Sequence, residues 1–203
     1  EYFLVTCPYS KKREDRLFFM KLLIKSLCIA FVLTVIYSVI PFQAECEQIS
    51  TEVFRLHILA NSDSEEDQAL KLKVRDALLE YTDELFNDAK DRNDAENIAK
   101  ENIETLQSVA QNTVYKNGCK YTVNAEVVKM YFNTRYYENY TMPAGIYDAL
   151  RITIGSGKGH NWWCVMYPSI CISSAIDNDE KVEKTFSENQ QEIVRGNEYE
   201  YKF

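Results

Sequence analysis

The amino-acid sequence predicts an α+β domain, in which a small, mainly antiparallel sheet packs against two helices, preceded by an N-terminal membrane or signal segment. Three observations support this fold class. An apolar run covers residues 22–42. Apolar side chains recur at spacings of three and four between residues 64 and 113, which is typical of helices. They alternate in two shorter stretches, 53–59 and 147–154, which is typical of strands with one buried face.

The apolar run 22–42 carries no charge after Lys25 and follows several basic residues. This arrangement is typical of an export signal or a single membrane anchor with its N-terminal side in the cytoplasm. Ala44 suits a cleavage point, but the bulky Phe42 two positions earlier does not, so cleavage and tethering both stay open. We therefore divide the chain into a basic cytoplasmic or upstream leader at 1–21, a signal peptide or membrane anchor at 22–44 and an exported domain at 45–203.

The exported part is strongly acidic. After Ala44 it carries 17 lysines and arginines against 28 aspartates and glutamates, a net charge of −11. Nucleic acid, anionic lipid and anionic wall polymer would be repelled by such a surface, so a protein partner is favoured. The acidity is equally typical of a domain that is merely kept soluble.

The exported part begins with a predicted strand at 53–59, which residues 61–64 end. Ser64 or Asp63 supplies an N-cap oxygen, and the predicted helix runs to about Leu85. A break at 91–94 precedes a second predicted helix at 95–113. After an Asn-Gly turn, the strand 121–132 has no purely apolar face, so we place it near a sheet edge.

The stretch 147–171 contains both tryptophans of the chain. A strand at 147–154 leads into a loop with three glycines, and we expect residues 162–167 to return as the second strand of a hairpin. Because neighbouring side chains of a strand point to opposite faces, one of Trp162 and Trp163 is expected in the core and the other facing outward. The outward ring is a candidate contact.

Two further stretches have predicted roles. The tyrosine-rich connection 133–143 includes Tyr136 and Tyr137 and is a second candidate contact surface, although ordinary packing of the rings explains it equally well. Near the C-terminus, residues 187–194 are typical of a short charged helix stopped by Gly196, and residues 199–203 are typical of a last strand.

Cysteine spacing predicts a disulfide bridge between Cys164 and Cys171, because a turn at Pro168 brings the two Cα atoms within bridging distance. Cys46 and Cys119 are a possible second pair.

The residues give little support for catalysis. The glycine loop lacks the Lys-Ser/Thr ending of a P-loop. A thiol nucleophile at Cys164 with His57 or His160 as base has no obvious orienting residue. The cysteine spacing does not match a zinc site, and the acidic residues 63–67 fit helix capping better than calcium binding. We therefore predict no enzyme, no catalytic residue, no metal and no cofactor.

Two blocks of the sequence closely resemble the stage II sporulation protein R family, which consists of secreted signalling proteins of endospore-forming bacteria. The first block comprises Arg55 to Ser64 and Asp67 to Asp76. The second comprises Ala144-Gly145, Tyr147, Ala149-Leu150-Arg151, Ile154-Gly155, Gly157, Gly159, Asn161-Trp162-Trp163-Cys164-Val165, Pro168 and Cys171.

The resemblance implies a protein that is made in the forespore, crosses the forespore membrane and acts between the two septal membranes. Its partner would be the membrane-embedded sporulation protease of the mother cell, the sigma-E factor processing peptidase. That enzyme is of the aspartic type, so the catalytic carboxylates would belong to the partner. No nucleic acid and no small-molecule substrate is expected.

The candidate partner-binding residues are Trp162, Trp163, Asn161, Arg151, Tyr147, Tyr136 and Tyr137. The alternative function is an exported wall-active enzyme or carbohydrate-binding module that uses Trp162 and Trp163 as a sugar platform.

Overall fold

The structure is a computed structural model that describes residues 8–137, 140–170 and 175–196. The chain forms two compact units, residues 1–44 and 45–203. The first helix, α1 (Pro8–Glu52), carries exposed apolar side chains from Leu17 to Phe42. Its part Arg16–Glu52 is long and apolar enough to cross a membrane. An N-terminal helix that fits a signal or membrane segment is therefore present, as predicted.

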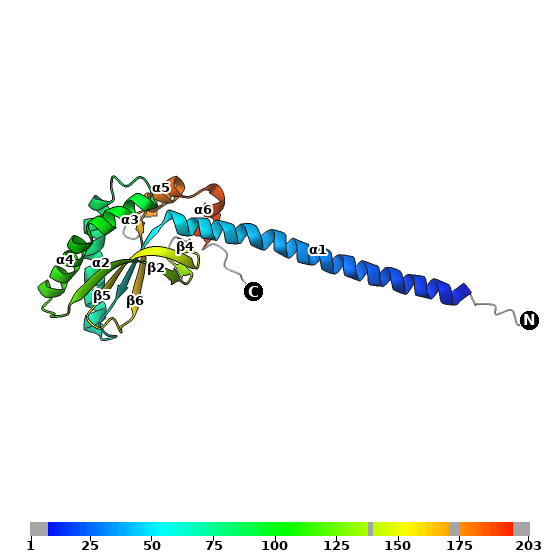
Figure 1. The fold of residues 1–203 in the computed structure, drawn as a ribbon, viewed down its shortest axis with the longest axis horizontal. Coiled ribbons are helices and arrows are strands. Elements are labelled where there is room, and N and C mark those ends of the chain that lie inside the picture. Colours follow the sequence, from blue (N-terminus) through cyan, green and yellow to red (C-terminus); the bar gives the residue numbers. More distant parts are fainter. Residues whose placement is uncertain (1–7, 138–139, 171–174, 197–203) are drawn as a thin grey trace, which may run out of the picture. The chain divides into compact units, whose positions relative to one another are not determined.

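The second unit is built on a four-stranded sheet with the order β2-β5-β1-β6 (Figure 1). Its strands are β1 (Phe54–Leu59), β2 (Val123–Phe132), β5 (Gly145–Ile154) and β6 (Asn161–Tyr167). The β2–β5 and β1–β6 pairs are antiparallel, and the β1–β5 pair is parallel. The predicted α+β class with a mainly antiparallel sheet is confirmed, and β2 lies at an edge as expected.

The predicted hairpin of β5 and β6 is wrong, because β1 lies between these two strands. Since β1 and β5 are parallel, their C-terminal ends meet at the same edge of the sheet. The glycine loop therefore crosses the chain that leaves β1 before β6 begins. Gly159 donates its N–H to the Ala60 carbonyl at 2.9 Å, and a Cβ on Gly159 would collide with the Ser62 carbonyl. Glycine is required here for the close crossing of two backbones.

Three helices follow β1, where the sequence predicted two. They are α2 (Glu65–Leu85), α3 (Arg92–Glu101) and α4 (Ile103–Lys116). The predicted Ser64 cap of α2 is confirmed, because its side chain accepts a hydrogen bond from the Asp67 N–H. The predicted second helix is broken at Asn102, which has φ −105° and ψ 15° and donates its side-chain amide to the Ile98 carbonyl at 2.9 Å. The Asn102 N–H still donates to the same carbonyl at 3.0 Å, so the boundary between α3 and α4 is a local change of backbone angles.

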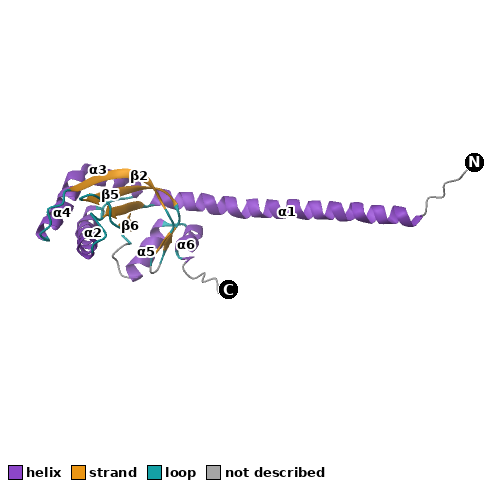
Figure 2. Cartoon of the chain, turned by 90° about the horizontal axis from the view of Figure 1, so that it is seen from below, coloured by secondary structure: helices purple, strands orange, loops and turns teal. Residues whose placement is uncertain are grey.

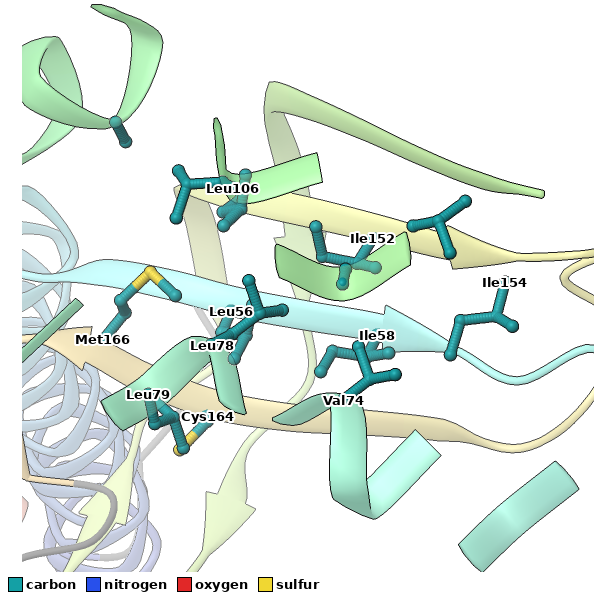
Figure 3. Packing of buried hydrophobic residues seen from close by; sticks show 14 of the residues in the cluster. Leu56, Ile58, Val74, Leu78, Leu79, Leu106, Ile152, Ile154, Cys164 and Met166 are labelled. Carbon is teal, nitrogen blue, oxygen red and sulfur yellow. The ribbon is translucent and has the colours of Figure 1, made fainter. Parts of the chain in front are cut away.

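One face of the sheet packs against α2, α3 and α4 (Figure 2). The buried side chains of this helix-side face are aliphatic or otherwise apolar. They include Leu56, Ile58, Val74, Leu78, Leu79, Leu106, Ile152, Ile154, Cys164 and Met166 (Figure 3). On β5 these side chains are the even-numbered ones, so the predicted alternation of that strand is confirmed.

The other face, which we call the far face, is covered in part by a second apolar cluster. This cluster draws on the last turns of α1, on the small sheet of β3 (Arg135–Tyr136) and β4 (Thr141–Met142), and on α5 (Ala175–Thr185) and α6 (Glu188–Val194). Strand β1 is consequently buried on both faces, whereas the sequence predicted one. The predicted helix at 187–194 is confirmed as α6 with Ser187 as its N-cap. The predicted strand at 199–203 lies outside the described residues.

Candidate functional site

The polar side chains of β1 gather on the far face. Arg55 and His57 point there, because they alternate with Leu56 and Ile58, which face the helices. Both are almost completely buried, with 0% and 4% of their surfaces exposed. Buried charged and polar side chains of this kind are unusual in a small domain and mark this face for closer attention.

Arg55 lies inside an aromatic cage without a carboxylate partner among the residues that the structure describes. Its guanidinium carbon is 4.4 Å from the ring centre of Phe132 and 4.9 Å from that of Tyr147. Its Nε donates to the Cys164 carbonyl at 3.0 Å, and its Nη2 donates to the Tyr137 hydroxyl at 2.9 Å. Cation–π contacts and hydrogen bonds therefore compensate for the lost hydration of the charge.

The Tyr137 hydroxyl extends this network, because it donates in turn to the Trp163 carbonyl at 3.1 Å. The network thus connects β1, the tyrosine-rich connection and β6. Removing the Arg55 side chain would leave the Cys164 carbonyl and the Tyr137 hydroxyl without this donor.

His57 stacks on Trp163. The two ring centres are 4.0 Å apart and the ring planes differ by 10°. Neither ring nitrogen of His57 has a hydrogen-bond partner among the described residues. Burial, together with the charges of Arg151 and Arg135, lowers the His57 pKa to about 4. His57 is therefore neutral at physiological pH, and its ring packs against the ring of Trp163.

The two tryptophans lie on opposite faces of the sheet, and both rings are half-buried. Trp162 packs against the helix-side core, where the Arg75 guanidinium carbon is 4.4 Å from its ring centre. Trp163 packs against the far-face cluster, with Arg135 at 4.9 Å from its ring centre. The prediction that the two rings separate is correct, but neither ring is fully outward. Because the two rings lie on opposite faces of the sheet, they do not form the single sugar-binding platform that the alternative function requires.

The glycine loop is saturated with internal hydrogen bonds. The N–H groups of Gly155, Gly157, Lys158 and Gly159 all donate to backbone carbonyls. The remaining two, from Ser156 and His160, donate to the side chains of Asn61 and Asp63. An anion cradle needs several unpaired N–H groups that converge on one point. This loop has none, so its role is to cross the end of β1.

A cleft opens beside Trp163, with a volume of about 380 Å³. We call it the Trp163 cleft; its lining residues are Asp63, Arg135, Lys158, Gly159, His160, Asn161 and Trp163. His160 pairs with Asp63 through its ring and its backbone N–H, and these hydrogen bonds lower the Asp63 pKa. The predicted contact residues Trp163 and Asn161 thus lie in one cleft with side chains from the glycine loop and β3.

The other predicted contact residues lie apart from this cleft lining. Arg151 is half-buried on the far face and pairs with Glu126 at 2.8 Å. Tyr136 is 77% exposed, and Tyr137 is half-buried in the Arg55 network. Tyr147 is fully buried, where its hydroxyl donates to the Pro143 carbonyl at 2.7 Å. Burial raises the Tyr147 pKa to about 12, so this ring supports the site from within.

The cysteine predictions have two outcomes. Cys46 and Cys119 are both free thiols, so the possible second pair is wrong. Cys164 is fully buried in the helix-side core, and its predicted partner Cys171 lies outside the described residues. The bridge between Cys164 and Cys171 therefore stays a prediction. Cys164 and His57 face opposite sides of the sheet. His57 is therefore not placed to act as a base for a thiol nucleophile at Cys164.

Sequence reasoning missed Arg55, His57 and Arg135 as parts of the site. For Arg55 and His57 a signal was present, since both alternate with the apolar residues of a strand that turned out to be central. A polar side chain on a strand buried on both faces needs a partner in the fold. For Arg135 no signal was present, because its position over Trp163 depends on the path of the connection between β2 and β5.

Comparisons with known proteins agree with the family that the two sequence blocks resemble. Residues 50–177 match the family described as Stage II sporulation protein R. Stage II sporulation protein R of Bacillus subtilis (strain 168) is 34% identical over 149 residues, which cover 72% of this chain and 66% of that protein. The chain thus spans slightly less than two thirds of the length of this relative. No solved structure matches the chain. The matched residues include β1, the three helices, the glycine loop and the tryptophan pair, and the chain belongs to the stage II sporulation protein R family.

Proposed function

We propose that this protein is an exported signal of sporulation that activates a membrane-embedded aspartic protease of the mother cell, the sigma-E factor processing peptidase. Activation leads to cleavage of the sigma factor E precursor. The protein is made in the forespore and acts in the space between the two septal membranes. It contributes a binding surface, and the catalytic groups belong to the protease.

Family membership over residues 50–177 is the observation that carries this proposal. Two physical features support it. The exposed apolar part of α1 suits export or anchoring. The net charge of −11 after Ala44 disfavours nucleic acid and anionic lipid as partners.

A signal without catalytic groups acts through differential affinity. It shifts the protease toward its active state only as far as it binds that state more tightly than the inactive one. A tenfold preference corresponds to about 1.4 kcal/mol. A rigid contact surface strengthens binding to the state whose shape it fits, because the signal loses little conformational entropy in that complex. The aromatic stack and the hydrogen-bond network of the far face meet this requirement.

The test is complementation in sporulating Bacillus subtilis that lacks its own stage II sporulation protein R. The full chain is expressed in the forespore, and processing of the sigma factor E precursor is followed by immunoblot. We expect the processed form to return. If the chain accumulates outside the forespore cytoplasm while the precursor stays uncleaved, the proposal fails.

A matched pair of variants tests the export step. Leu27→Arg combined with Phe31→Arg places two charges within the apolar part of α1, where each costs about 2.5–3.5 kcal/mol of insertion free energy. We expect loss of export and of processing. Leu27→Ile combined with Phe31→Leu keeps the segment apolar and should retain both.

A further inference from the structure

The Trp163 cleft is lined by two cations, Arg135 and Lys158, and by one carboxylate, Asp63, which pairs with His160. Neither cation has a carboxylate partner among the residues that the structure describes. The Nε of Arg135 is buried and has no hydrogen-bond acceptor there. A buried donor without an acceptor costs about 1–3 kcal/mol, so the hydrogen bonding of this guanidinium is incomplete.

This local charge contrasts with the rest of the exported part, whose net charge is −11. Burial lowers the His57 pKa, and Arg151 and Arg135 each lie near enough to His57 for their charges to lower it further. Glu126 pairs with Arg151 and Asp63 pairs with His160, whereas Arg135 and Lys158 form no ion pair among the described residues. An acidic partner would therefore be repelled by most of the surface and attracted at this cleft, which fixes its orientation.

The geometry selects a carboxylate over a phosphate. The backbone N–H groups of residues 155–160 are all used internally, so any anion is met by side chains alone. Asp63 also lines the cleft, and its carboxylate would repel a dianion more than a single carboxylate. His57 stacks on the Trp163 ring and Arg135 lies over it, so the part of this half-buried ring that stays exposed is the apolar surface beside the two cations. Trp and Arg together are typical of the anchors in protein–protein interfaces.

We propose that the Trp163 cleft binds an acidic segment of a protein partner, with one Asp or Glu carboxylate between Arg135 and Lys158 and a neighbouring apolar side chain against Trp163. The guanidinium of Arg135 suits such a carboxylate because its fork of N–H donors matches two oxygen atoms. Stacking over Trp163 holds that fork in place before binding. This inference deepens the proposed function and rests on it only for the identity of the partner.

The test measures binding of the purified full chain, in detergent micelles, to a fluorescein-labelled peptide of alternating glutamate and phenylalanine. The matched probe has glutamine in place of glutamate. We expect saturable binding of the acidic peptide that weakens with salt, and no binding of the neutral one. Arg135→Gln and Lys158→Gln should each weaken binding by about tenfold, the loss of one charge-assisted hydrogen bond.

Two variants serve as controls. Arg135→Lys keeps the charge at the same position and should retain part of the affinity. Lys116→Gln removes an exposed charge from the last turn of α4 and should change nothing. Lys158→Gln alters a side chain without a described partner in an exposed position, so its folding is secure and its result can be interpreted even if Arg135→Gln is destabilised.

Three results of the binding test would overturn the inference. The two probes would bind equally, or both charge-removing variants would bind like the unmodified chain, or inorganic phosphate or poly(glycerol phosphate) would displace the acidic peptide at equal charge concentration. The last result would indicate a wall polymer as the ligand. If complementation fails while the chain still binds the acidic peptide in a way that depends on Arg135, only the proposed function is contradicted. Normal complementation by the Arg135→Gln and Lys158→Gln chains would contradict the cleft alone.

Discussion

The two faces of the sheet are stabilised by different physics, although they share every strand. On the helix-side face, β1 contributes Leu56 and Ile58 to a continuous apolar core. On the far face, the same strand contributes Arg55 and His57, which depend on aromatic rings and hydrogen bonds. An apolar face tolerates many arrangements of similar volume, whereas a buried polar network requires one particular arrangement. The far face is therefore the one suited to hold a binding surface rigid.

The largest expected effect compares adjacent residues of β1. Leu56→Ala empties a fully buried site and should lower the free energy of unfolding by about 3 kcal/mol. Arg55→Met fills most of the volume but leaves the Cys164 carbonyl and the Tyr137 hydroxyl without their donor, which should cost about 2 kcal/mol. Urea unfolding of the full chain in micelles measures both. A more stable Arg55→Met chain would mean that desolvation of the guanidinium outweighs its contacts.

The pH dependence of stability tests the far face through His57. Its pKa is lowered to about 4 in the folded protein, against an ordinary value near 6.5. As pH falls from about 6.5 to 4, the unfolded chain takes up a proton that the folded chain does not, so stability is lost on acidification. The contribution between pH 7 and pH 4.5 is about 2–3 kcal/mol.

The matched variant for this prediction is His57→Phe, which keeps a ring against Trp163 and has no titrating group. Its unfolding free energy should fall less on acidification than that of the unmodified chain, and it should not be lower at pH 7, because both His57 nitrogens lack partners. Equal slopes for the two chains would show that carboxylates alone cause the acid sensitivity.

A contrast between local patterns and long-range pairing explains which parts of the fold the sequence could predict. Periodicity was sufficient for α2, for β2 at an edge and for the alternation of β5, since each depends on a local pattern of apolar residues. The place of β1 between β5 and β6 was not predictable in this way, because strand order depends on long-range pairing. The helix that periodicity continued is divided at Asn102 by a local change of backbone angles that the pattern does not encode.

The residues of the candidate site also divide into those that the sequence could predict and those that it could not. The tryptophan pair was recognised from its neighbours in the chain, and strand alternation was enough to separate the rings. The buried roles of Arg55 and Tyr147 and the position of Arg135 over Trp163 required the packed structure. Site residues joined by non-local contacts are therefore the ones that sequence alone leaves out.

The two tryptophans, one on each face of the sheet, allow the two faces to be compared by their effects on function. Trp163→Ala removes the ring that lines the cleft, and we expect partner binding to weaken roughly thirtyfold, about 2 kcal/mol. Trp162→Ala acts on the helix-side face and should reduce stability with little effect on signalling by the protein that remains folded. Processing of the sigma factor precursor is normalised to the exported protein level in each strain. Trp163→Phe, a smaller change, separates loss of contact from loss of folding.

If neither folded tryptophan variant loses activation, Trp163 is not a hot spot for the partner. The exposed Tyr136 on β3 is then the next residue to test, because it belongs to the same connection as Arg135 and is 77% exposed.

The smallest expected effect concerns Arg75, which lies over Trp162 as Arg135 lies over Trp163. Arg75 also pairs with the neighbouring Asp76, in a contact that is largely exposed and adds little. Arg75→Met keeps apolar contact with the Trp162 ring and removes the charge, so it should lower the unfolding free energy by about 0.5–1 kcal/mol. Signalling and acidic-peptide binding should be unchanged, in contrast to Arg135→Gln. A loss of peptide binding in Arg75→Met would place part of the contact surface on the helix-side face and remove the functional distinction between the two faces.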